Sequence, residues 1–276
     1  MPARKVIYAR PRGQFKTIPL RRRLPCPFDE ARLSARTAGV FKPAGFKGTP
    51  RKVQRYGWVP DLPDQRDHTY AVAAHLVSNL PDNVDLRDQC PDVYDQGQLG
   101  SCTGNAIAAA LEFDRMKQGL DDFTPSRLFI YYNERVLEGT VDSDSGAQIR
   151  DGIKSVAQQG DCPETEWPYD ISKFADAPPQ SCYDDALKYT AVQYQSVDQN
   201  LADMQGCLAT GYPFVFGFTV YESFESDGVA QTGNMPMPNS GEQVIGGHAV
   251  LAVGYDNEDR VFIVRNSWGE GWGDAG

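Results

Sequence analysis

The chain has 276 residues, enough for one two-lobed domain or two small ones. Its net charge of −10 is unevenly distributed, because residues 1–50 carry 12 Lys and Arg against 2 acidic residues, while the rest carry 15 against 35. An acidic body repels nucleic acid and anionic membranes, so we expect neither as a partner. No apolar run is long enough to cross a membrane, and the N-terminus lacks the apolar region of a signal peptide.

The first 80 residues fall into two parts. Residues 1–55 form a basic, polar leader that we expect to be flexible. Residues 56–80 contain several prolines, which favour an extended chain, and Trp58 and Leu62 are candidate anchors. Such an arm lies either in a peptide-binding cleft or elsewhere on the surface as a structural element. The compartment stays open, with a secreted or cell-envelope location slightly favoured over the cytoplasm.

A candidate nucleophile follows a glycine-rich polar turn, DQGQLGSC, that ends at Cys102. Residues 106–117 have helical spacing and Gly119 is a suitable stop, so Cys102 is expected at a helix N-terminus. The helix dipole there lowers the pKa of a thiol and favours the nucleophilic thiolate. Gln96 lies just upstream, where its amide can point at whatever the sulfur attacks. A lone cysteine of this kind is more often a small buried apolar residue, so the assignment needs a base elsewhere.

His248 and Asn266 are the candidate partners of that cysteine. His248 precedes a strand-like apolar run, and Asn266 follows a second one at 261–264. The turn 256–259 joins the two runs into a hairpin, which brings both side chains to one end of a sheet. Taken singly, the histidine could be structural and the asparagine a turn residue.

In order and local spacing, these three segments resemble the signature blocks of the papain family of cysteine peptidases. The resemblance runs from about Leu80 to the C-terminus. It implies that Cys102 is the nucleophile, His248 the general base and acid, and Asn266 the residue that orients the imidazole. It also implies an oxyanion hole made by Gln96 and the backbone N–H of Cys102.

The same resemblance implies an α+β, papain-like two-lobe fold over residues 81–276, with the active site in the cleft between the lobes. The helical lobe would span about 81–190 and an antiparallel, barrel-like β lobe about 191–276. Because the family is made as zymogens, residues 56–80 are expected to cover the cleft as an intramolecular inhibitor. The residues expected to contact substrate, or in the last case to shield the His–Asn bond from water, are Ser145, Gly146, Ala147, Gly217, Gly247 and Trp268.

The sequence also departs from the family pattern. Thr103 stands where most members carry Trp, and Leu99 stands where many carry a disulfide cysteine. These changes suggest a divergent bacterial branch with a short prosegment, the xylellain-like type. Family members continue with another strand beyond the point reached at Gly276, so the sequence is either trimmed or has that strand supplied otherwise.

Further elements are expected in both halves of the chain. Residues 124–135 predict a helix capped by Thr124 or Ser126, and residues 149–159 predict a helix that ends at Gly160. The aromatic and β-branched run 213–221 predicts a buried strand.

The remaining cysteines suggest a disulfide bond rather than a metal site. Cys162 and Cys182 bracket a loop, and a disulfide between them would hold it closed. Cys26, Cys90 and Cys207 form no CxxC or Cys–His cluster, so no metal and no cofactor is expected, and Cys207 should be buried and inert.

The sequence therefore predicts a monomeric cysteine endopeptidase that hydrolyses proteins or peptides through a thiolate–imidazolium pair and is made as a zymogen. Two other classes stay open. One is a related Cys–His acyl-transfer enzyme, such as an amidase, aminopeptidase or transferase, and the other is a catalytically silent binding protein. Labelling of Cys102 by a thiol-reactive peptide epoxide separates the silent protein from the enzymes.

Overall fold

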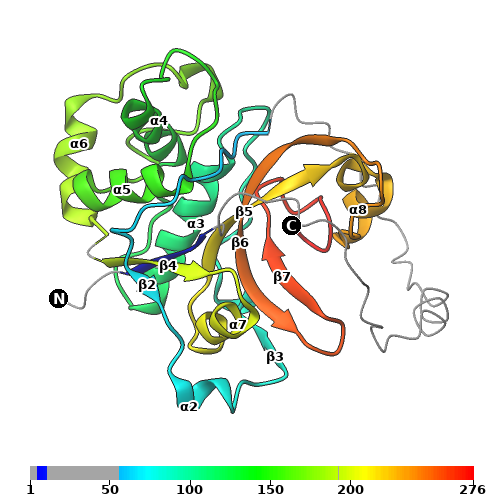
Figure 1. The fold of residues 1–276 in the computed structure, drawn as a ribbon. Helices are drawn as coiled ribbons and strands as arrows, with labels where there is room; N and C mark the ends of the chain where they lie inside the picture. Colours follow the sequence, from blue (N-terminus) through cyan, green and yellow to red (C-terminus); the bar gives the residue numbers. More distant parts are fainter. Residues whose placement is uncertain (1–4, 11–55, 192) are drawn as a thin grey trace. The chain divides into compact units, whose positions relative to one another are not determined.

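The computed structural model describes residues 5–10, 56–191 and 193–276 (Figure 1). Most of the predicted leader, and Cys26 with it, lies outside the described residues. Among the described residues, no helix is long and apolar enough to cross a membrane.

The described helices are α2 (Ala74–Val77), α3 (Cys102–Lys117), α4 (Arg127–Glu138), α5 (Ile149–Gln159), α6 (Gln180–Ala186), α7 (Leu201–Ala209) and α8 (Asp227–Thr232). Short 3-10 helices occur at Arg87–Gln89, Ile171–Lys173, Leu187–Tyr189 and Glu222–Glu225. The described strands are β1 (Lys5–Arg10), β2 (Thr69–Tyr70), β3 (Asn83–Asp85), β4 (Gln193–Asp198), β5 (Phe214–Tyr221), β6 (Val244–Asp256) and β7 (Val261–Arg265).

The predicted helices are confirmed, with shifts at two of their starts. α5 has the predicted bounds, and α3 ends just before Gly119, whose φ of 61° suits a helix stop. α3 already begins at Cys102, four residues before the predicted start. α4 begins later than predicted because Ser126 is its cap, with the side chain accepting a hydrogen bond from the N–H of Phe129 at 3.1 Å.

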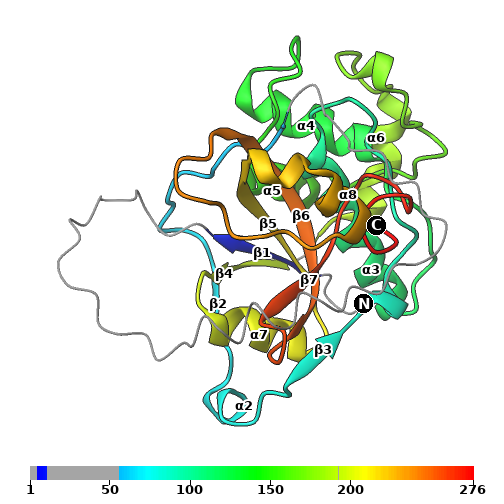
Figure 2. The ribbon, with the colours of Figure 1, turned by 90° about the vertical axis from the view of Figure 1, so that its right-hand side faces the viewer.

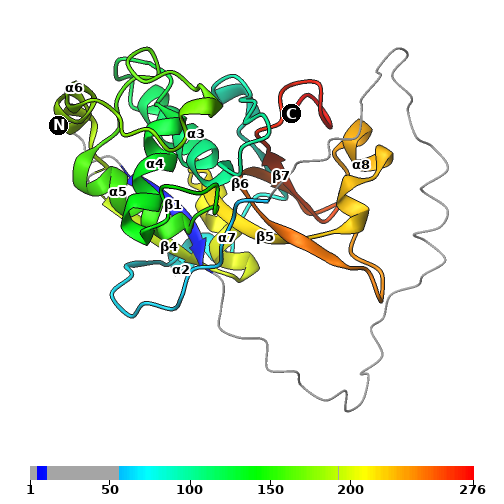
Figure 3. The same cartoon turned by 90° about the horizontal axis from the view of Figure 1, so that it is seen from above.

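Helix α3 lies in the middle of the fold. It is buried from Cys102 to Arg115, with packed neighbours on every side. Figures 1 and 3 show α4 and α5 on one side of α3 and strands β5 and β6 on the other. Small side chains let neighbouring elements approach a helix closely, and α3 has four alanines in five positions between Ala106 and Ala110.

The sheet is mixed and follows the path β2-β4-β1-β5-β6-β3, with β7 paired to β6. The pairs β5–β6 and β6–β7 are antiparallel, as predicted, and the pair β3–β6 is antiparallel as well. The pairs β1–β4, β1–β5 and β2–β4 are parallel, and each contains β1 or β2, which lie outside residues 191–276, the range predicted for the antiparallel β lobe. The physical reason is that β1 and β2 come from the N-terminal region and enter the sheet in the same direction as β4. The path of the described strands is open and does not close into a barrel.

Strand β1 lies within the leader that was predicted to be flexible. Residues 5–10 lie within the segment predicted to be flexible, yet they pair with β4 along six consecutive positions. This part of the leader is therefore a strand of the sheet.

Strand β6 is the longest strand described and carries the β lobe. Its first half pairs with β5, its last residues pair with β3, and its other edge takes β7 (Figure 2). The predicted hairpin of β6 and β7 is confirmed. Its register sets where the side chains of the site meet.

Candidate active site

His248 and Asn266 meet at one end of the β6–β7 hairpin. Leu251 pairs with Arg265 at the last residue of β7, so Asn266 comes directly after β7 and lies beside the middle of β6, near His248. The Nε2 atom of His248 is 2.8 Å from Oδ1 of Asn266, and both side chains are buried. Oδ1 also accepts a hydrogen bond from the backbone N–H of Ser267 at 2.8 Å, which fixes it as an acceptor. Nε2 therefore carries the proton that it donates to Asn266.

Cys102 approaches this pair from the helical side. It is the first residue of α3, and its Sγ accepts a hydrogen bond at 3.4 Å from the N–H of Ala249, the neighbour of His248. The side chain is fully buried, and this burial raises the pKa of the thiol to about 12. Hydrogen bonds from the N–H groups of Ala249, Gly57 and Thr103 act in the opposite direction and lower the pKa. The shift of the thiol pKa is opposite to the predicted lowering, because burial outweighs these backbone hydrogen bonds.

Gln96 is held in one orientation by two hydrogen bonds. Its Oε1 accepts from the hydroxyl of Ser267 at 2.6 Å, and its Nε2 donates to the carbonyl of Leu99 at 2.9 Å. The amide nitrogen is thereby fixed as the donor end, with a second N–H beyond the one given to Leu99. Sequence analysis missed Ser267, although its position directly after Asn266 was the available signal.

Aromatic side chains cover the imidazole of His248. The Trp268 ring lies 5.0 Å from it, centroid to centroid, at 31° between planes. Tyr56 and Phe218 approach it edge-on at 6.0 and 5.8 Å. Trp268 is itself buried, so the side of His248 that carries the bond to Asn266 lies in an apolar setting.

The arm passes through the cleft and pairs with both walls. On the helical wall, the N–H of Ala147 donates to the carbonyl of Gly57 at 2.8 Å, and the N–H of Val59 donates to the carbonyl of Ala147 at 3.0 Å. On the β wall, the N–H of Trp58 donates to the carbonyl of Gly247 at 2.8 Å. From there the segment runs along α5 toward β2 (Figure 1).

Glycines make this close passage possible. A Cβ on Gly217 would lie 2.0 Å from the indole of Trp58, and a Cβ on Gly146 would lie 2.1 Å from the carbonyl oxygen of Gly57. A Cβ on Gly57 itself would lie 1.6 Å from the carbonyl oxygen of Gly100. Any side chain at these three positions would therefore displace the arm.

The structure bears on two of the expected contacts. The hydroxyl of Ser145 bonds to Thr140 and to the carbonyl of Gly146, within its own loop. Leu62, a predicted anchor, is 75% exposed, and Trp58 alone of the two is inserted between the walls. Ala147, Gly217 and Gly247 do line the passage of the arm.

The predicted disulfide is not formed. Cys162 and Cys182 are free thiols, buried in one apolar cluster with Phe129. The two thiols are hydrogen-bonded to each other, and burial raises the pKa of both, which keeps them protonated. Cys207 is buried, as expected, and its thiol donates to the carbonyl of Tyr212 at 3.3 Å.

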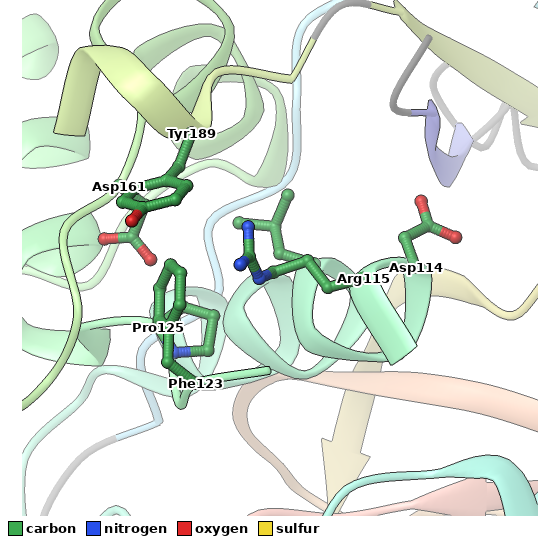
Figure 4. A pocket seen from close by; sticks show the side chains of 7 residues that line it. Asp114, Arg115, Phe123, Pro125, Asp161 and Tyr189 are labelled. Atoms are coloured by element: carbon green, nitrogen blue, oxygen red, sulfur yellow. The ribbon is translucent and has the colours of Figure 1, made fainter. Parts of the chain in front are cut away.

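A small cavity lies away from this cleft, near the C-terminal end of α3 (Figure 4). Its volume of about 10 Å³ is room for one water molecule and not for a peptide. Both carboxyl oxygens of Asp161 are buried there, and burial raises the pKa of this group. Within the described part of the chain, no three His, Cys, Asp or Glu side chains are arranged to hold a metal ion.

The chain belongs to the papain family of cysteine proteases. Residues 80–276 match the family described as papain family cysteine protease. The chain is 44% identical to an uncharacterized peptidase C1-like protein of Acanthamoeba polyphaga mimivirus, over 80% of this chain and 79% of that protein. It is 31% identical to cathepsin B-like CP3 of Giardia intestinalis, over 72% of this chain and 68% of that protein.

Solved structures agree on the fold. Xylellain, a cysteine protease from Xylella fastidiosa, is 44% identical and superposes with a TM-score of 0.75, over 86% of this chain and 91% of that one. Procathepsin B S9 from Trypanosoma congolense superposes with a TM-score of 0.63 at 18% identity, over 80% of this chain and 78% of that one, which supports the fold alone. The two-lobe papain-like architecture and the cysteine protease class therefore hold for this chain.

Proposed function

We propose that this protein is an endopeptidase in which Cys102 attacks the peptide carbonyl and His248 transfers the proton. The observation that carries the proposal is the 2.8 Å bond between His248 and Asn266 directly beside the sulfur of Cys102. Asn266 would hold the imidazole with Nδ1 toward the thiol. The second N–H of Gln96, together with the N–H of Cys102, would stabilise the oxyanion.

The reaction needs a thiolate, and burial under the arm opposes one. Once the arm leaves, water and Nδ1 of His248 gain access to the sulfur, and a thiolate–imidazolium pair can form. The thiolate attacks the carbonyl, His248 protonates the leaving amine, and a water activated by His248 then hydrolyses the thioester. The products are a carboxylic acid, an amine and the free thiol.

The backbone of the arm lies against the sulfur of Cys102 with an N–H group and not with a carbonyl group, which fits an inhibitor and not a substrate. The N–H of Gly57 bonds to Sγ, while the carbonyl of Gly57 is engaged by Ala147. Described peptide bonds are all trans, so the carbonyl of Tyr56 points away from the side that faces the sulfur. Cys102 thus meets a peptide N–H where a scissile carbonyl would have to lie, and this supports an autoinhibitory role for residues 56–59.

Deleting residues 1–80 would be a poor test of that role. It would remove β1 and β2, which pair with β4, and Val72, whose N–H donates to Asp203 at 3.0 Å. A loss of activity would then reflect a broken sheet. Displacing the arm within the full chain is the sharper experiment.

Gly57→Ala does this with one methyl group, because the new Cβ would collide with the carbonyl of Gly100. The matched control is Gly228→Ala in α8, where a Cβ has open space and φ is not positive. We expect Gly57→Ala to raise hydrolysis of a fluorogenic dipeptide-amide panel at least tenfold over the full chain and the control. Cys102→Ala in the same background should abolish the signal.

Equal activity of the full chain and Gly57→Ala would contradict the inhibitory arm but leave the peptidase intact. Absence of hydrolysis and of peptide-epoxide labelling in every variant would overturn the peptidase itself. Protein or peptide substrates and a monomeric state are the expectations that accompany this proposal.

A further inference from the structure

A carboxylate in the loop before α5 holds the segment that leads to Cys102. The backbone N–H of Gly100 donates to Asp144, with the nitrogen 3.1 and 3.0 Å from the two carboxylate oxygens. Gly100 lies between Gln96 and Cys102, so this bond is made to the segment that carries both proposed oxyanion donors. Asp144 lies three residues before Ala147, whose backbone pairs with the arm.

A tyrosine of α4 joins the same carboxylate to the helical wall of the cleft. The hydroxyl of Tyr131 donates to Oδ1 of Asp144, and its oxygen accepts a hydrogen bond at 3.2 Å from the N–H of Gly146. Gly146 is the neighbour of Ala147. A continuous chain of hydrogen bonds therefore runs from the peptide-binding wall to Gly100, and we call it the Asp144–Tyr131 link.

The hydroxyl of Tyr131 is held as a donor to this carboxylate. The ring is fully buried and packs with Leu99 and Leu128 in one apolar cluster. Burial, together with the hydrogen bond to Asp144, raises the pKa of Tyr131, so the hydroxyl keeps its proton at neutral pH. Hydrogen bonds to a carboxylate are roughly twice as strong as those between neutral groups, which favours a well-ordered link.

The link holds the chain next to a position where the sequence departs from the papain family. Leu99 directly precedes Gly100 and stands where many members carry a disulfide cysteine. A leucine cannot form that covalent cross-link. The carboxylate of Asp144 supplies a non-covalent one at the adjacent residue, between segments 44 residues apart in sequence.

We infer that Asp144 and Tyr131 are positioning residues that hold the oxyanion donors in place relative to the peptide-binding wall. The inference rests on the proposed function, because it takes Ala147 to pair with a substrate backbone as it pairs with the arm. One end of the link fixes Gly100, between the two donors, and the other end fixes Gly146. Movement between these ends would shift the scissile carbonyl relative to the sulfur, and a displacement of about 1 Å can lower a rate by about 10²-fold.

The test uses variants of the full chain in the Gly57→Ala background. Tyr131→Phe removes the hydroxyl and leaves the packed ring, whereas Asp144→Asn keeps the size of the side chain and replaces one acceptor oxygen with a donor. Asp144→Ala removes both acceptors. The matched control is Tyr183→Phe, because the hydroxyl of Tyr183 also makes a hydrogen bond within the helical lobe, to Asn133 at 3.0 Å.

We expect Asp144→Ala to lower kcat by about 30 to 100-fold and Tyr131→Phe by about 3 to 10-fold, with KM changed by less than about threefold. The peptide still pairs with Ala147 in these variants, so its binding is largely retained. Titration with the peptide epoxide counts active sites, so a misfolded fraction cannot imitate a lower kcat. Tyr183→Phe should leave kcat unchanged.

The two residues should also act through one chain of bonds. The double variant Tyr131→Phe with Asp144→Asn should therefore lose less activity than the product of the two single losses. Melting temperatures of all variants report on folding. A loss confined to KM, or a kcat in Tyr131→Phe and Asp144→Asn equal to that of the control, overturns the inference.

A labelling measurement separates this inference from the peptidase proposal. Cys102 is alkylated in each variant by the peptide epoxide and, in parallel, by iodoacetamide, which does not use the peptide-binding wall. The epoxide rate divided by the iodoacetamide rate should fall by about tenfold or more in Asp144→Ala and stay constant in Tyr183→Phe. Such a fall supports the positioning role even if no variant hydrolyses the panel. A constant quotient in a series that does cleave overturns the positioning role and leaves the peptidase standing.

Discussion

The two walls of the cleft hold their reactive groups in different ways. On the β wall, His248 and Asn266 are fixed by the pairing of β6 with β7, two strands adjacent in sequence. On the helical wall, the sulfur of Cys102 accepts a hydrogen bond from the N–H of Gly57. Gly57 belongs to the arm and to neither wall of the cleft. Full burial of the side chain raises the pKa of the Cys102 thiol, and the backbone N–H of Gly57 acts in the opposite direction.

This difference suggests where control acts. The bond between His248 and Asn266 is built by the β6–β7 hairpin. The nucleophile is the group whose protonation a covering segment changes, because removing water from a thiolate costs more than three backbone N–H bonds return. Four changes test this contrast, from the largest expected effect to the smallest.

Cys102→Ala and, separately, His248→Ala in the Gly57→Ala background should each lower kcat/KM by about 10⁴-fold or more, since nucleophile and base act as a unit. The double variant should have a kcat/KM only slightly lower than that of either single variant. Steady-state kinetics on the fluorogenic panel measures this. Additive losses would contradict a shared reaction step across the two walls.

Gln96→Ala in the same background should lower kcat by about 10² to 10³-fold with a smaller change in KM, because a donor to the oxyanion acts mainly in the transition state. Ser267→Ala frees the Gln96 amide to rotate and should give part of the same loss. If both variants raised KM and left kcat unchanged, Gln96 would bind substrate and not the oxyanion.

Raising the pH from 5 to 7 should weaken docking of the arm. Burial raises the pKa of Asp61 from 3.8 to about 6, with Arg150 acting in the opposite direction and Asp151 and Asp67 adding to the rise. A raised pKa means that the docked arm holds the proton more tightly, so this contribution is full below about pH 4 and is lost as the pH passes 6. The shift of about two units corresponds to up to roughly 100-fold in the docking equilibrium.

The readout is the kcat/KM of the full chain divided by that of Gly57→Ala at each pH, which cancels the titration of the catalytic groups. This quotient should rise between pH 5 and 7 and be flatter in Asp61→Asn. An unchanged slope in Asp61→Asn would assign the pH dependence to another group, such as Glu138, whose pKa burial raises to about 7.

Ser126→Ala should have the smallest effect, and it tests the helical wall apart from the arm. The hydroxyl caps α4 and donates to the carbonyl of Trp167 at 2.7 Å. Its loss should cost about 1 kcal/mol and lower Tm by roughly 2–4 °C. Calorimetry measures this, and a fall in kcat without a fall in Tm would show that the cap acts on the site itself.

The sequence by itself determined the local features. Glycines, a capping serine and apolar periodicity fixed α3, α4 and α5 to within a few residues, because such signals act over one helical turn. The hairpin of β6 and β7 brought His248 and Asn266 together for the same reason, since a short turn sets its own register.

Only the tertiary structure decided what depends on contacts between distant segments. The direction of the thiol pKa shift required knowing that Cys102 is fully buried in the packed chain, and the carboxylate that binds Arg150 belongs to Asp67, 83 residues away. The parallel pairing of β1 with β4 likewise joins strands that no local pattern links. Burial and charge pairing are properties of the packed chain, and a carboxylate or a thiol has the same local sequence whether it is exposed or covered.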